Sequence, residues 1–118
     1  MALLSGGAPH IILGSGRVQQ GSGFYSGTLS GNIALDDTYP NLLKLDPGGS
    51  ARDVTLPAEA TSEGRWYRIV NAADAAENLV IKDDGGSTIG TANQNEEIEV
   101  VCSGAAWVLV CVRTIALS

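Results

Sequence analysis

Paired acidic residues are the side chains of this sequence with the clearest capacity for chemistry. Asp83-Asp84 precedes two glycines, which would suit a calcium loop, and the pairs Asp36-Asp37 and Glu96-Glu97 could in principle serve a glycosidase. The EF-hand spacing is missing, however, and neighbours on a strand point to opposite faces, so no two carboxylates are identified that face each other across a cleft. We therefore interpret Asp83-Asp84 as part of a solvated turn and predict no metal site.

Nucleophilic and phosphate-binding patterns are incomplete as well. A Ser-His-Asp triad would need His10, the single histidine, which lies in a glycine-rich segment where catalytic geometry is hard to fix. Gly14-Ser15-Gly16 lacks the third glycine of a dinucleotide fingerprint because Gln19 stands in its place, and no phosphate loop is present. The sequence predicts a protein that is not an enzyme and that binds no cofactor.

Cys102 and Cys111 fall within one expected hairpin that turns at residues 104–105. In that hairpin Cys102 pairs with Trp107 and Cys111 with Ile98, so the thiols lie about four residues apart, roughly 13 Å at ~3.3 Å per residue. A disulfide permits a Cα separation of only about 7 Å. We expect two small buried hydrophobic side chains rather than a disulfide, a metal pair or a nucleophile.

Aromatic residues offer one further possibility. Trp66, Tyr67 and Trp107 could form a platform on which a sugar stacks, but the chain holds only two Trp, three Tyr and one Phe. Aromatic side chains at strand positions in so sparse a set are favoured as core or interface anchors.

Composition narrows the class of partner. Thirteen acidic and seven basic residues give a formal charge of −6 without any basic run, which disfavours binding to a nucleic-acid backbone. No apolar run approaches the ~20 residues of a membrane helix, and no positive region precedes the apolar start of the chain. We expect a protein made in the cytoplasm that binds neither nucleic acid nor membrane.

Short apolar runs between Gly, Asn and Asp turns predict an all-β protein. Asp46-Pro47-Gly48-Gly49 is a strong turn signal, and residues 71–78 are expected to form a loop that could include one helical turn. The expected strands cover residues 28–35, 41–45, 53–56, 65–70, 79–82 and 88–91, followed by a hairpin over 97–113. These strands predict one all-β domain over residues 28–118.

Residues 1–27 differ from the remainder, because they hold seven of the fifteen glycines and no acidic residue. Short apolar groups between flexible Gly-Ser pieces predict an extended arm that docks onto another surface. A disordered leader with one edge strand is the alternative.

The last hairpin is expected to have two unlike faces. The core face carries Ile98, Val100, Cys102, Trp107, Leu109 and Cys111, and the other face carries Glu97, Glu99, Val101, Val108, Val110 and Val112. Four valines are unusual on the outside of a monomer, so we predict that a second sheet or another subunit covers them.

Several short motifs occur in an order that is similar to a known module. The motifs are Val54-Thr55-Leu56-Pro57, a strand with Gly64, Tyr67, Ile69 and Asn71, then Asn78-Leu79 with Ile81, and a closing hairpin with Gly104 and Trp107. Over about residues 41–113 this order resembles the β-sandwich module of tailed-bacteriophage virion proteins, which occurs in head decoration proteins, head fibres and some tail fibres.

The resemblance implies a small antiparallel, jelly-roll-like β-sandwich that assembles as a homotrimer on the outer capsid surface of the virion and stabilises the head. The arm would then bind the major capsid protein through Leu3, Leu4, His10, Ile11, Ile12, Leu13, Arg17 and Val18. The trimer interface would use Tyr67, Val101, Val108, Val110 and Val112. The alternative function is a host- or glycan-binding module of a phage head or tail fibre.

Overall fold

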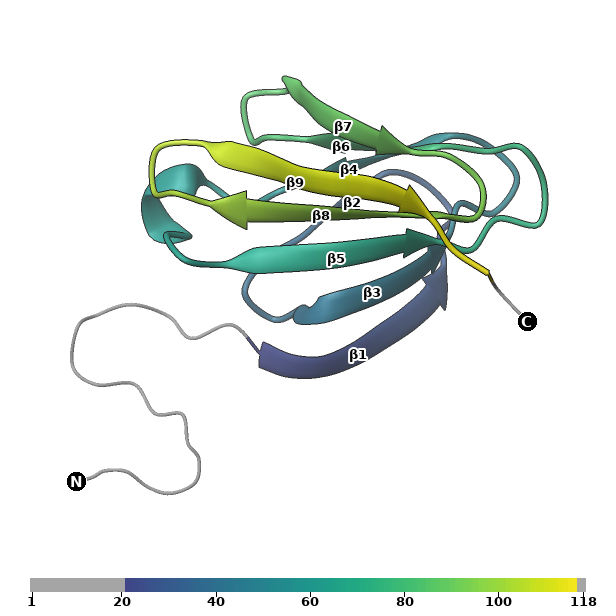
Figure 1. The fold of residues 1–118 in the computed structure, drawn as a ribbon, viewed down its shortest axis with the longest axis horizontal. Helices are drawn as coiled ribbons and strands as arrows, with labels where there is room; N and C mark the ends of the chain where they lie inside the picture. Colours follow the sequence, from purple (N-terminus) through teal and green to yellow (C-terminus); the bar gives the residue numbers. More distant parts are fainter. Residues whose placement is uncertain (1–20, 117–118) are drawn as a thin grey trace.

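The computed structural model describes residues 21–116, and the regular elements of this part are strands except for one 3₁₀ turn at Glu59–Thr61. The strands are β1 (Gly21–Thr28), β2 (Ile33–Ala34), β3 (Pro40–Asp46), β4 (Arg52–Thr55), β5 (Trp66–Asn71), β6 (Leu79–Lys82), β7 (Thr88–Ala92), β8 (Glu96–Cys102) and β9 (Trp107–Thr114). They form a five-stranded sheet, β1-β3-β5-β8-β9, and a four-stranded sheet, β2-β4-β6-β7 (Figure 1). The all-β prediction is confirmed for this part of the chain.

Both sheets are mixed, which corrects the prediction of an antiparallel, jelly-roll-like arrangement. From β1 to β6 the chain alternates between the sheets, so that β1, β3 and β5 run parallel in one sheet and β2, β4 and β6 run parallel in the other. A parallel pair needs a crossover, and here each crossover passes through the opposite sheet. Only the pairs β5–β8, β6–β7 and β8–β9 are antiparallel.

The crossings between the sheets stack on one another through backbone hydrogen bonds. At one side, Leu29 N–H donates to the carbonyl of Asp46 at 2.7 Å and Ala72 N–H donates to that of Leu45 at 2.8 Å. At the other side, Leu35 N–H donates to the carbonyl of Thr55 at 2.8 Å. These bonds satisfy backbone groups that would otherwise be buried without partners. The first six strands therefore form three stacked turns of a coil.

Side chains from both sheets form one apolar core. Fully buried side chains alternate along the strands, as they do along Leu43 and Leu45 of β3 and Tyr67 and Ile69 of β5. The cluster comprises Leu29, Leu35, Leu43, Leu45, Val54, Leu56, Tyr67, Ile69, Leu79, Ile81, Ala92, Ile98, Val100, Cys102 and Trp107.

The beginning of the folded part differs from the predicted boundaries. The structure places Gly21–Thr28 in the five-stranded sheet as β1, although residues 21–27 were expected to belong to the arm. The expected strand over 28–35 is instead a crossing between the sheets, followed by the two-residue strand β2. Leu29 begins this crossing and Leu35 follows β2, and both side chains are buried.

The closing hairpin has the expected turn but a different register at its far end. Cys102 pairs with Trp107, as predicted, whereas Cys111 pairs with Glu99 and not with Ile98. The register shifts between Glu99 and Val100, which makes Val110 the extra residue of a β-bulge. As a consequence Cys111 lies on the outer face with Glu99, which corrects the expected alternation beyond Leu109.

Candidate functional site

The outer face of the five-stranded sheet carries charged groups that compensate one another. Arg68 on β5 lies 3.9 Å from Glu97 and 3.6 Å from Glu99 on β8. Arg113 on β9 donates a hydrogen bond to Glu97, and this bond together with the Glu97 charge raises the pKa of the guanidinium. The charges therefore form a network along the sheet and not a basic or acidic patch.

Next to this network, β9 exposes a row of apolar side chains at the edge of the sheet. Val108 is 46% exposed, Leu109 41%, Val110 54% and Val112 38%. Val101 on β8 lies directly opposite Val108 and is half-buried. Four residues of the predicted interface, Val101, Val108, Val110 and Val112, thus lie on neighbouring strands at one edge, although the bulge turns Val112 toward the face of Ile98.

Tyr67 is not part of that surface, which corrects its assignment to the trimer interface. Its side chain is 0% exposed and lies 5.8 Å from the ring of Trp107. The Tyr67 hydroxyl donates to the carbonyl of Asp36 at 3.3 Å, and burial raises its pKa. The Trp107 indole N–H donates to the carbonyl of Pro57 at 2.8 Å. Both aromatic side chains are core anchors with a satisfied polar atom.

A sugar platform of the three aromatic side chains does not form. Tyr67 and Trp107 point into the core, whereas Trp66 precedes Tyr67 on the same strand and therefore points to the outer face, where it is half-buried. The interpretation as structural anchors is confirmed for Tyr67 and Trp107.

A second exposed apolar group lies at the opposite edge of the same sheet. Phe24 and Tyr25 on β1 are 62% and 36% exposed, and the ring of Tyr25 meets that of Tyr39 edge-on with centroids 5.3 Å apart. The sequence analysis missed this pair because the surrounding glycines favoured an arm. The adjacent aromatic residues Phe24-Tyr25 were the available signal, since aromatic residues are enriched in strands.

The acidic pairs have local structural roles. Asp83 Oδ1 accepts hydrogen bonds from the backbone N–H of Gly85 at 3.0 Å and of Ser87 at 2.8 Å, which confirms the predicted turn. Asp36 Oδ1 binds the hydroxyl and the N–H of Thr38, and these two hydrogen bonds lower its pKa. Glu96 Oε1 accepts from the N–H of Asn93 at 2.9 Å.

Three carboxylates do come together, one at the end of β3 and two in the loop between β5 and β6. Ligand oxygens of Asp46, Asp74 and Glu77 lie within 4.8 Å of one another, and such oxygens are the ligands that divalent cations such as Ca²⁺ prefer. Asp46 Oδ1 also accepts from the N–H of Gly48 at 2.9 Å, and Asp74 is exposed. Within residues 21–116 these are the side chains best placed to hold a metal ion, and the sequence did not indicate it because Asp46 is far from Asp74 and Glu77 along the chain.

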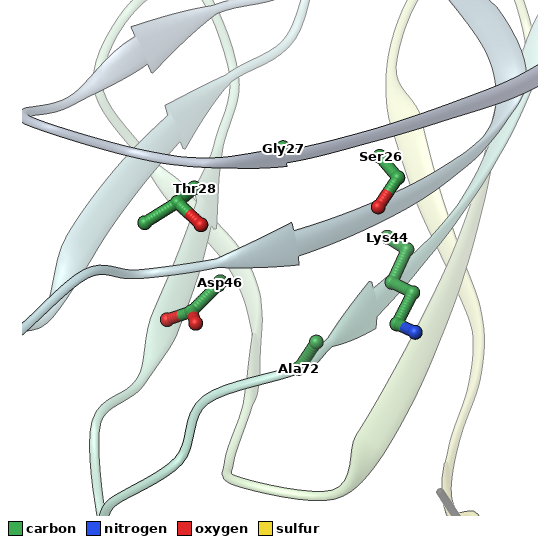
Figure 2. A pocket seen from close by; sticks show the side chains of 6 residues that line it. All are labelled: Ser26, Gly27, Thr28, Lys44, Asp46 and Ala72. Carbon is green, nitrogen blue, oxygen red and sulfur yellow. The ribbon is translucent and has the colours of Figure 1, made fainter. Parts of the chain in front are cut away.

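A shallow depression of about 280 Å³ lies between the ends of β1 and β3. Figure 2 shows Ser26 and Thr28 on β1 facing the same side as Lys44 and Asp46 on β3, with Ala72 beyond them. Its lining offers hydroxyls, one amine and one carboxylate, which can hydrogen-bond a small polar molecule but include no pairing of a nucleophile with a base.

The residues predicted to bind the capsid, from Leu3 to Val18, lie outside the described residues, as does His10. Within residues 21–116 no helix is long and apolar enough to cross a membrane. Comparison with protein-family models, with curated proteins and with solved structures gave no match to this chain.

Proposed function

We propose that the protein is a non-enzymatic bacteriophage capsid decoration protein, a homotrimer that binds the outer capsid surface of the virion and stabilises the head. The proposal starts from the order of motifs over residues 41–113, which resembles that of virion proteins. In this proposal the two sheets around one core act as a rigid two-layer β-sandwich body.

The observation that carries the proposal is the exposed apolar row on β9. Soluble monomers seldom expose contiguous apolar patches, and such patches mark contacts with other proteins. Val108 and Val110 stand beside a charged network that keeps the remaining outer face polar, and Val112 is exposed at the same edge on the face of Ile98. A surface of this composition suits a subunit contact better than a catalytic site.

The capsid contact is assigned to the segment before β1. All thirteen acidic residues of the chain lie after position 20, whereas residues 1–20 contain Arg17, His10 and the apolar run Ile11-Ile12-Leu13. A trimer presents three such segments to the shell, and three weak contacts on one particle act as a strong one. The major capsid protein is the proposed partner.

Deletion of residues 1–20 tests this assignment. The truncated chain should remain a folded trimer and should lose binding to undecorated heads, measured by co-sedimentation with capsids. A scrambled version of residues 1–20 controls for length and composition. If the truncated protein binds heads as well as the full chain does, the segment is not the capsid-binding element.

A host- or glycan-binding module of a phage fibre is the alternative in a different class. Electron microscopy of virions with a labelled chain separates the two functions, because decoration predicts many copies over the shell and a fibre module predicts few. A glycan array supplies the second measurement. The platform of Trp66, Tyr67 and Trp107 gives the alternative no support, since Tyr67 and Trp107 are buried.

A further inference from the structure

The exposed large hydrophobic side chains of residues 21–116 have an unusual distribution. All six of them lie on β1 or β9, the two edge strands of the five-stranded sheet. They are Phe24 and Tyr25 on β1 and Val108, Leu109, Val110 and Val112 on β9. A side chain at a sheet edge lacks the lateral neighbour that a further strand would provide. Both edge strands therefore expose large apolar side chains that no further strand covers.

The two edges are also compatible in direction. β1 is parallel to β3 and β5, and two successive antiparallel pairs bring β9 back to the same direction (Figure 1). The pairings place Tyr25, Leu43, Ile69, Ile98 and Val112 in one row across the sheet. A neighbouring copy could thus place its β1 beside β9 as a parallel strand, with the stretch after the Val110 bulge facing residues 24–27.

Charge also favours a second copy of this chain as the partner. The segment that leads into β1 has Arg17 and no acidic residue, and it joins the strand at Gly21. With the rows of two copies aligned, β1 begins beside the β8–β9 turn of its neighbour, because Gly21 lies at the same end of the sheet as Val108. Glu63 lies at that turn, where a Cβ on Gly104 would be 3.3 Å from its side chain. The oppositely charged parts of two copies are then brought together.

We propose that β1 of one copy packs against β9 of the next copy, so that the chain assembles head to tail through two different edges. A head-to-tail contact closes into a ring of three when each copy is turned by about 120° relative to the last, and it otherwise gives an open filament. This inference rests on the homotrimer of the proposed function but not on binding to a capsid.

Single charges at the two edges test the contact in the full chain. Phe24→Lys and Val110→Lys alter exposed side chains, so the fold should persist in both, as checked by circular dichroism and thermal unfolding. Each variant alone should weaken self-association at least about thirtyfold in analytical ultracentrifugation. Ala76→Lys, which adds the same charge at an exposed loop position, should associate as the unchanged chain does.

Mixing the two edge variants gives the decisive result. The Phe24→Lys chain keeps an intact β9 and the Val110→Lys chain keeps an intact β1, so their mixture should form a two-chain species that neither forms alone. Retained assembly of either single variant would mean that like edges pair with each other, and would overturn the proposal. A monomeric unchanged chain would overturn both this contact and the proposed trimer, whereas filaments would support the contact and contradict the trimer.

Discussion

The first six strands and the last three are built in different ways. From β1 to β6 the chain changes sheets after every strand, and residues far apart in sequence hold the crossings together, such as Leu29 with Asp46 and Leu35 with Thr55. In the last three strands, β7 pairs with β6 and a tight turn joins β8 to β9, so strands that follow each other in sequence pair directly, except that the chain changes sheets between β7 and β8. The coil therefore depends on corners that allow close backbone contact, and the hairpin depends on register.

The largest expected effect comes from breaking a corner of the coil. Gly48 has φ +78°, and a Cβ at this position would lie 2.1 Å from the carbonyl oxygen of Leu29 in the neighbouring crossing. Gly48→Ala should therefore lower the free energy of unfolding by about 3 kcal/mol or more, measured by urea denaturation. The backbone carbonyl cannot move without disturbing the hydrogen bond from Leu29 to Asp46.

Gly49→Ala is the matched control for that corner. Gly49 also has positive φ, at +107°, but a Cβ added at this position would meet no atom within 4 Å. Only the conformational strain remains, at about 1–2 kcal/mol. Equal losses for the two variants would mean that the neighbouring crossing does not approach Gly48 as closely as the stacked coil requires.

A smaller effect is expected where the two sheets meet, between β7 and β8. Gly90 on β7 lies across the core from the hairpin, and a Cβ there would be 2.7 Å from Ile98 Cδ1. Because that atom ends a flexible side chain, Gly90→Ala should cost only about 1–3 kcal/mol. Gly31→Ala, with open space around it, should stay within about 1 kcal/mol of the unchanged chain.

Removing the obstructing atom sharpens this test. Ile98→Val deletes Cδ1 and should cost about 0.5–1.5 kcal/mol by itself. In combination with Gly90→Ala it should recover much of the loss, because the added methyl group fills the space that Cδ1 leaves. Additive losses in the double variant would argue against close packing of β7 on β8.

The hairpin could be predicted largely from the sequence, whereas the coil could not. In residues 97–102 and 107–109, side chains that face the core alternate with side chains that face outward, and Gly104 marks the turn. The local pattern was therefore sufficient to predict the hairpin. Parallel pairing of β1, β3 and β5 leaves no comparable mark, because the partners are separated by whole strands and crossings. The expected antiparallel arrangement failed for that reason.

The missed features have equally specific causes. β1 contains several glycines, which oppose strand formation, and it forms because β3 offers a continuous ladder of partners from Phe24 to Thr28. The bulge at Val110 follows a regular run of valines that gives no sign of an extra residue. Asn71 was expected to start a loop, yet it is buried. Its side-chain amide donates hydrogen bonds to the backbone carbonyls of Glu77 and Ala92 at 2.8 and 2.9 Å. Such a role depends on tertiary contacts alone.

The cysteines test the register of the hairpin without a large change in stability. Cys102 is buried and burial raises its pKa, whereas Cys111 lies on the outer face beyond the bulge. In dilute protein, a thiol reagent should label Cys111 at least about tenfold faster than Cys102, since reaction needs an accessible thiolate. Single Cys→Ser variants assign the rates. Equal slow labelling would indicate a regular hairpin with both thiols on the core face.

The smallest effect concerns a corner of the coil at Asp36, and it is measured as a change in the pKa of Asp36 and in the pH dependence of stability. The Thr38 hydroxyl and N–H hold the pKa of Asp36 below its usual value in the folded chain. A lowered folded pKa stabilises the protein above the unfolded pKa of about 3.9 and ceases to do so as the pH falls through the folded value. In a carboxyl NMR titration, Thr38→Val should raise the pKa of Asp36 toward its ordinary range, whereas Thr38→Ser should leave it low. The stability difference between these variants should shrink in acid, because a protonated Asp36 no longer distinguishes them. A difference that persists unchanged at low pH would assign the role of Thr38 to packing at the corner and not to the carboxylate.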